Sequence, residues 1–181
     1  MFLIFDHLDS DKLVGFIDAR LEAPAYEWIT PGSWSQKTRI RKLQGVPQPT
    51  EIAVVEMHDF HDDVCTVHGF DRLPHSSGIF SSGREFTASN GRTYRWKHAS
   101  TGWTLTDQSE HPLAHPPHQP NTVPPPEPAC VATYRGTALR VFPVAYPILD
   151  EIVATAMYME WRKQENDEAV KAAKIGFKAG S

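Results

Sequence analysis

The sequence has 181 residues and only two cysteines, Cys65 and Cys130, which are too few for a small domain built on a disulfide framework. It also lacks a run of about 18 apolar residues, the length that crosses a membrane as a helix. The first apolar stretch, residues 1–5, is too short for a secretory signal and lacks preceding basic residues, so it predicts a first strand. We therefore expect a cytoplasmic protein without a transmembrane segment, in which both cysteines are buried, reduced thiols.

An excess of basic residues is missing as well. Eighteen lysines and arginines stand against 22 aspartates and glutamates, which gives a formal net charge of −4. Because nucleic-acid binding depends on neutralising phosphates, no nucleic-acid partner is expected. The sequence also has no G-x-S-x-G nucleophile elbow, no glycine-rich phosphate loop and no Walker A lysine. No motif therefore assigns a catalytic residue, and no cofactor is expected.

Proline is in excess, and the excess is local. Eight of the 15 prolines lie between Pro112 and Pro128. Proline lacks the backbone donor that a helix or a central strand needs, so residues 109–129 are predicted to be a disordered, extended insertion. The insertion would interrupt a single domain that spans residues 1–164. Pro124–Pro126 would suit an aromatic groove on a partner protein, although the segment carries no basic anchor beside them.

Most of the remaining chain has the pattern of short strands separated by turns, which is typical of a sandwich or a barrel. The strands predicted from this pattern are 13–17, 26–29, 37–43, 51–57, 64–67, 103–106, 131–135 and 138–142.

The turn at Asn90-Gly91 allows two registers for one further hairpin. A three-residue loop, 89–91, pairs Phe86 with Tyr94 and places both on one face with Trp96, whereas a two-residue loop turns Phe86 away from them. The longer loop needs a left-handed residue in its last position, which a glycine adopts without strain. We therefore predict the three-residue loop.

The C-terminal part predicts the only helix of the domain, over residues 148–163. Asp150 and Glu151 at its start suit the helix dipole and are interpreted as structural. No residue from Ile152 to Met159 is charged, so just over two helical turns are apolar on every side and are expected to be buried. Residues 165–181 are predicted to form a charged helical extension or a tail.

Strands followed by one buried helix resemble the tubby-like fold, which tubby, LURP-one-related and phospholipid-scramblase-like domains share. More closely, residues 86–97 and 149–160 resemble a family of uncharacterised fungal domains found widely in mushrooms. The resemblance covers residues 13 to about 163 and brings no established activity. It implies a mainly β fold with one C-terminal helix, in which a closed antiparallel β-barrel surrounds the buried hydrophobic helix.

A further candidate is the basic strand that contains Lys37, Arg39, Arg41 and Lys42, and Arg92, Arg95 and Lys97 could extend its patch. The resemblance implies a lipid site here, because tubby-like domains that bind phosphoinositide headgroups use a basic patch on the barrel. The alternative is a charged strand that resists edge pairing. From this feature and the insertion we expect a non-catalytic binding module for anionic lipid headgroups or a protein partner.

His58, His61 and Asp62 are the densest group of potential metal ligands. They fall in a turn between two predicted strands, where such residues are commonly solvated, so no metal is favoured. The alternative function is a small-molecule enzyme, belonging to secondary metabolism if the protein is fungal, with a site at the rim near these three residues.

Overall fold

The computed structural model describes residues 1–5, 16–21, 23–30, 37–58, 61–76, 83–109 and 129–178. The predicted proline-rich insertion, apart from its two ends, lies outside these residues, as do residues 13–15 of the second predicted strand. The insertion and its use by a partner therefore stay predictions.

The described strands form two antiparallel sheets. The large sheet has nine strands in the order β3-β2-β1-β14-β13-β12-β11-β10-β9, and the small sheet has five in the order β4-β5-β6-β7-β8. The strands of the large sheet are β1 (Phe2–Phe5), β2 (Phe16–Asp18), β3 (Ala23–Pro24), β9 (His75–Ser76), β10 (Gly83–Thr87), β11 (Thr93–Ala99), β12 (Gly102–Asp107), β13 (Cys130–Arg135) and β14 (Ala138–Val141). Those of the small sheet are β4 (Tyr26–Ile29), β5 (Lys37–Lys42), β6 (Thr50–Glu56), β7 (Val64–Val67) and β8 (Phe70–Asp71).

The closed barrel expected from the resemblance is wrong. Across the described residues, the large sheet ends at β3 and β9, the small sheet ends at β4 and β8, and no ladder joins these edges. The three strands β3, β8 and β9 have only two residues each, and Pro24 and Pro74 near them have no backbone N–H to donate. These short edge strands therefore offer few backbone N–H donors with which a ladder could continue from one sheet to the other. The mainly β fold with a C-terminal helix is confirmed, as two open sheets.

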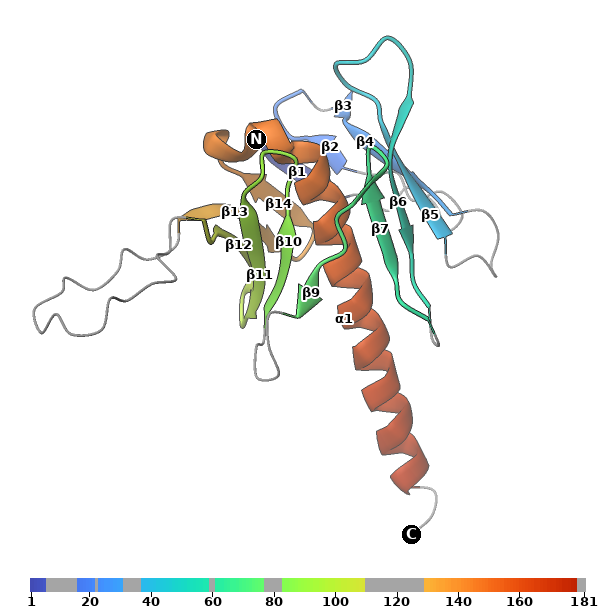
Figure 1. The fold of residues 1–181 in the computed structure, drawn as a ribbon. Coiled ribbons are helices and arrows are strands. Elements are labelled where there is room, and N and C mark those ends of the chain that lie inside the picture. Colours follow the sequence, from blue (N-terminus) through green and yellow to red (C-terminus); the bar gives the residue numbers. More distant parts are fainter. Residues whose placement is uncertain are drawn as a thin grey trace, which may run out of the picture.

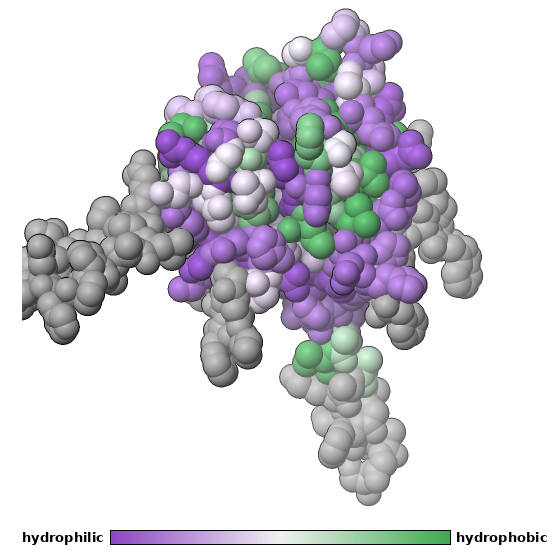
Figure 2. Space-filling view, viewed as in Figure 1, coloured by the Kyte–Doolittle hydropathy of each residue, from purple (hydrophilic) through white to green (hydrophobic). Residues whose placement is uncertain are grey.

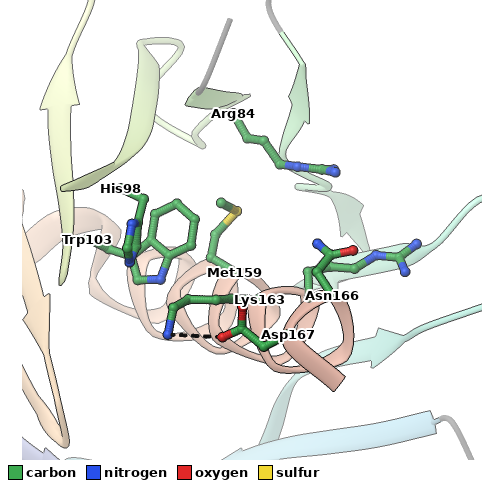
Figure 3. A pocket seen from close by; sticks show the side chains of 8 residues that line it. Arg84, His98, Trp103, Met159, Lys163, Asn166 and Asp167 are labelled. Atoms are coloured by element: carbon green, nitrogen blue, oxygen red, sulfur yellow. Dashed lines mark ion pairs between the residues drawn. The ribbon is translucent and has the colours of Figure 1, made fainter. Parts of the chain in front are cut away.

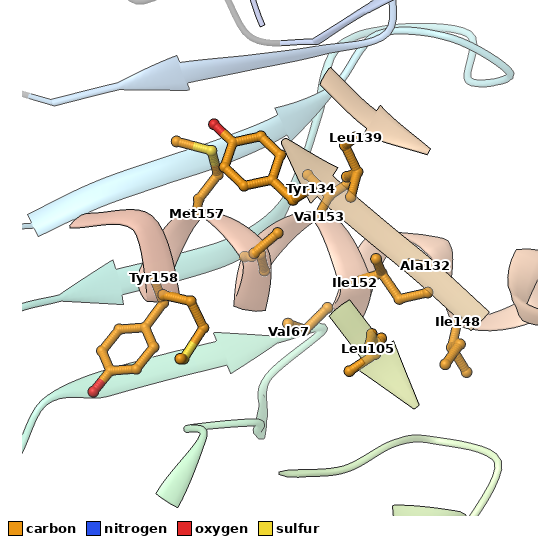
Figure 4. Packing of buried hydrophobic residues seen from close by; sticks show 14 of the residues in the cluster. Val67, Leu105, Ala132, Tyr134, Leu139, Ile148, Ile152, Val153, Met157 and Tyr158 are labelled. Carbon is orange, nitrogen blue, oxygen red and sulfur yellow. The ribbon is translucent and has the colours of Figure 1, made fainter. Parts of the chain in front are cut away.

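The helix α1 (Leu149–Lys178) follows a short 3₁₀ helix, η1 (Pro143–Ile148), and runs between the two sheets before extending beyond them (Figure 1). Residues 152–159 are all buried, because the uncharged run has apolar neighbours on every side. Figure 4 shows Ile152, Val153 and Met157 of α1 beside side chains from both sheets, including Val67 and Leu105. Between residues 164 and 172 most side chains of α1 are exposed. No helix among the described residues is long and apolar enough to cross a membrane.

The predicted three-residue hairpin loop is confirmed. Phe86 lies opposite Tyr94 in the β10–β11 ladder, and Gly91 has a positive φ of 75°. The rings of Phe86 and Tyr94 stack with their centroids 5.9 Å apart, and both residues are buried together with Trp96. The register therefore delivers three aromatic side chains to the face that packs on α1.

The two cysteines are free, as expected, but only one of them is buried. Cys65 lies in the core, where burial raises the pKa of its thiol to about 12. Cys130 is exposed at the first position of β13, so the expectation of burial is wrong for this residue.

A buried hydrogen bond joins the large sheet to α1, and its loss should be measurable. Trp96 Nε1 donates to Thr155 Oγ1 at 3.0 Å, and both residues are fully buried. Thr155→Val keeps the side-chain shape but leaves the indole N–H unsatisfied, so we expect the free energy of unfolding to fall by about 1–3 kcal/mol. Urea unfolding measures this, with Thr104→Val on the half-buried outer face as a control expected to stay within about 0.5 kcal/mol. Equal stability of the two variants would contradict the prediction.

Candidate functional site

Each basic residue of the predicted lipid-binding strand is paired with a carboxylate. β5 is an inner strand of the small sheet, so acidic side chains of neighbouring elements lie within reach. The pairs are Lys37 with Glu56 (2.6 Å), Arg39 with Glu51 (3.1 Å), Arg41 with Glu27 (2.7 Å) and Lys42 with Asp150 (2.9 Å). Arg95, on β11 of the other sheet, pairs with Glu85 (2.6 Å). The strand therefore presents no uncompensated positive charge, and protection of a sheet edge does not explain it either.

The predicted histidine turn does not form a metal centre within the described ranges, where no group of three or more histidine, cysteine or acidic side chains could hold an ion. His61 and Asp62 are exposed, and the His58 and His61 ring centroids are 6.3 Å apart. His58 Nε2 lies 3.6 Å from a carboxylate oxygen of Glu56. Residues 59 and 60 of this turn lie outside the described residues. None of the three predicted residues lines the pocket described below.

The residue after Asp62, Asp63, has a structural role, because its carboxylate accepts hydrogen bonds from two other parts of the chain. Its carboxylate is 3% exposed and accepts hydrogen bonds from Tyr158 Oη (2.7 Å), Arg162 Nε (2.7 Å), Arg162 Nη2 (2.9 Å) and the backbone N–H of His58 (3.0 Å). Burial, together with the hydrogen bond to Asp63, raises the pKa of Tyr158 to about 12, so the phenol remains a donor. Asp63 thus ties the turn before β7 to α1.

Asp150 and Glu151 also do more than complement the helix dipole, because they reach opposite sheets. Asp150 accepts hydrogen bonds from Tyr26 Oη (2.7 Å) and Lys42 Nζ (2.9 Å) of the small sheet. Burial alone would raise the pKa of Asp150, but the hydrogen bonds from Lys42 and Tyr26 outweigh it and hold the pKa below its usual value. Glu151 accepts from Arg72 Nε (2.6 Å) and, in the β10–β11 turn, from Ser89 N (2.7 Å) and Ser89 Oγ (3.1 Å). Both carboxylates are saturated by structural contacts.

A pocket of about 260 Å³ lies where α1 leaves the sheets, and we call it the helix pocket. Its lining combines cationic, aromatic and amide side chains from β10, β11, β12 and α1. The lining residues are Arg84, His98, Trp103, Met159, Arg162, Lys163, Asn166 and Asp167. Figure 3 shows Arg84 on one side of the pocket and His98 with Trp103 on the other, with Met159 between them and Lys163 and Asp167 on the exposed side of α1.

A second cavity, of about 370 Å³, lies on the outer face of the large sheet, and we call it the outer groove. Its lining residues come from β1, β13, β14 and the position just before η1, and they are Phe2, Thr133, Arg135, Ala138, Arg140 and Phe142. Phe2, Arg140 and Thr133 lie side by side on adjacent strands, and the Arg140 guanidinium lies 4.9 Å from the centre of the Phe142 ring. In the part of the chain that the structure describes, neither Arg135 nor Arg140 pairs with a carboxylate. Neither arginine belongs to the basic strand predicted from the sequence.

Comparison with protein-family models gives one finding. A model described as a family of unknown function, DUF6593, matches residues 9–165. The chain belongs to the DUF6593 family. The DUF6593 match includes most of both sheets and the buried part of α1, and it stops where the side chains of α1 become mostly exposed. Resemblance to an uncharacterised domain family is therefore confirmed, while the match carries no information on fungal origin or on a tubby-like relationship. Curated proteins and solved structures give no match.

Proposed function

We propose that this DUF6593 domain is a non-catalytic binding module that docks on anionic membrane surfaces at the cytoplasmic face through the outer groove. The observation that carries the proposal is the pair Arg135 and Arg140, which lie on adjacent strands without a carboxylate partner among the described residues. Arginine is the side chain best suited to phosphate, because its guanidinium presents a planar fork of donors.

A third cation lies in the same row of the large sheet. The register runs from Arg140 through Thr133 and Thr104 to Lys97, whose side chain is exposed and has no carboxylate partner within the described ranges. Because the whole chain has a net charge of −4, attraction to a membrane must come from a local cluster. A screening length of about 8–10 Å at physiological salt allows such a cluster to act independently of acidic residues elsewhere.

Apolar side chains accompany these cations. Phe2 is 42% exposed and Ile4 39% exposed, and both project from the outward positions of β1. Aromatic and aliphatic side chains next to basic residues are suited to the boundary between headgroups and acyl chains. The face shown in Figure 2 is mainly hydrophilic, with small hydrophobic areas between the polar side chains.

Co-sedimentation with vesicles tests the proposal. We expect binding to vesicles of phosphatidylcholine with phosphatidylserine, weaker binding as salt is added, and no sedimentation with phosphatidylcholine alone. Each basic residue near an anionic surface contributes about 1 kcal/mol, so the double variant Arg135→Ala/Arg140→Ala should bind about 30-fold more weakly.

The matched control is Arg39→Ala/Arg41→Ala, which removes the same charge from β5. Because both of these arginines are neutralised by glutamates, we expect the control to bind within about twofold of the unaltered protein. Equal binding to neutral vesicles, or an equal loss in the control variant, would contradict the proposal. Binding to a protein partner with no vesicle binding would support the other function expected from the sequence.

A further inference from the structure

We propose that the helix pocket is a binding site for a small organic carboxylate with a single negative charge and a flat apolar body. The pocket lies at the end of the sheets where α1 emerges, and none of its lining residues belongs to the outer groove. Its volume of about 260 Å³ lies just below the usual range for drug-sized ligands, so a molecule with one ring is the expected size.

Arg84 is the expected anchor for the negative group. Its Nη1 donates to the carbonyl oxygen of Pro74 (3.2 Å) and to Tyr158 Oη (3.1 Å), and the guanidinium lies 5.9 Å from the centre of the Tyr158 ring. These contacts hold the side chain in place through one nitrogen. Within the described part of the chain, Arg84 has no carboxylate partner. Its guanidinium is therefore held in one orientation with donors that a ligand can use.

The opposite wall is apolar and rigid. Trp103 is 8% exposed and Met159 3% exposed, and both line the pocket. The His98 ring contacts the Trp103 ring edge-on, with their centroids 4.8 Å apart, and Trp103 Nε1 donates to Glu160 Oε2 at 3.3 Å. Aromatic and thioether surfaces pack well against a flat apolar ring. Binding such a ring breaks no hydrogen bond of this wall.

The charges on α1 limit how negative the ligand can be. Arg162 is occupied by Asp63 and Glu165, so it contributes little to a ligand. Lys163 lies 4.0 Å from Glu160 and 3.8 Å from Asp167, distances longer than hydrogen bonds, so its ammonium group can turn toward an anion. The same acids repel a multiply charged ligand, and this repulsion favours a single negative charge.

Two-dimensional ¹H–¹⁵N NMR of the full chain, following the Trp103 indole resonance, tests the site with three probes: benzoate, phenyl phosphate and the neutral benzyl alcohol. We expect benzoate to bind at least about tenfold more tightly than benzyl alcohol, as measured by the shift of this resonance. Phenyl phosphate carries close to two negative charges at neutral pH, so we expect it to bind more weakly than benzoate. Tighter binding of phenyl phosphate than of benzoate would contradict the preference for a single charge.

Two substitutions should change the affinity in opposite directions. Arg84→Gln should weaken benzoate binding at least about tenfold, whereas Asp167→Asn should strengthen it about twofold to threefold because it removes a repelling charge from an exposed side chain. Lys163→Gln is a second test in case the Arg84→Gln protein does not fold. It removes a positive charge from α1 and should weaken benzoate binding about threefold. Arg39→Ala, on β5, should leave the affinity unchanged.

An unshifted Trp103 resonance, equal binding of benzyl alcohol, or weaker binding by the Asp167→Asn variant would overturn the assignment. No vesicles are used, so a failure here does not affect the membrane proposal.

Discussion

Replacing Glu151 with alanine is expected to lower the free energy of unfolding by about 3–5 kcal/mol. The Glu151 side chain is 4% exposed and that of its partner Arg72 is 14% exposed, so the pair is largely withdrawn from water. The substitution leaves a buried guanidinium without its carboxylate and also removes the acceptor for both donors of Ser89. Equilibrium unfolding in guanidinium chloride, followed by tryptophan fluorescence, measures the loss.

The control for this prediction is Glu51→Ala. Glu51 also pairs with an arginine, but its side chain is 44% exposed and that of Arg39 is 50% exposed, so we expect a loss below about 1 kcal/mol. A Glu151→Ala protein as stable as this control would mean that apolar packing alone holds the start of α1.

Asp63→Ala is expected to have an effect of similar size, about 3–5 kcal/mol. Asp63 accepts hydrogen bonds from Tyr158, from Arg162 and from the backbone of His58, so its removal leaves four donor groups without their acceptor. Because Tyr158 is in the core and its phenol also accepts from Arg84, the loss should loosen both the turn before β7 and the wall of the helix pocket. Urea unfolding measures the stability, and the amide resonances of β7 and α1 report where the change occurs.

The control is Asp62→Ala. Because Asp62 is exposed, we expect this substitution to change the free energy of unfolding by no more than about 0.5 kcal/mol. If the two aspartates proved equally dispensable, the network around Asp63 would have no net stabilising effect.

Local features of this fold could be predicted from the sequence because neighbouring residues decide them. The need for a left-handed glycine at position 91, combined with the alternation of faces, selects the pairing of Phe86 with Tyr94. The absence of charge from Ile152 to Met159 is enough to predict burial, since no face of that helix suits water. Closure of the sheets cannot be predicted in this way, because it depends on whether the edge strands of the two sheets pair with one another. That pairing is a property of distant segments, and no local pattern contains it.

The candidate sites were harder to predict for the same reason. The basic residues of β5 have the spacing of a headgroup site, but their acidic partners come from other elements, such as Glu27 on β4 and Asp150 on α1. Conversely, Arg135 and Arg140 each alternate with inward apolar residues, which predicts that they face outward. No local pattern shows that β1 pairs with β14 and that β14 pairs with β13. This order of strands is what brings both arginines close to Phe2.

The pairing of β1 with β14 has a consequence for how the chain is made. β1 is an inner strand of the large sheet, yet its partner β14 is synthesised more than a hundred residues later, and α1, which fills the space between the sheets, comes later still. A nascent chain that ends before Ile152 would carry two sheets whose inner faces have nothing to pack against. The core can therefore assemble only after α1 has left the ribosome, and folding that rests on such distant pairing is slow. During that interval the inner faces of both sheets would be exposed to aggregation or to chaperones.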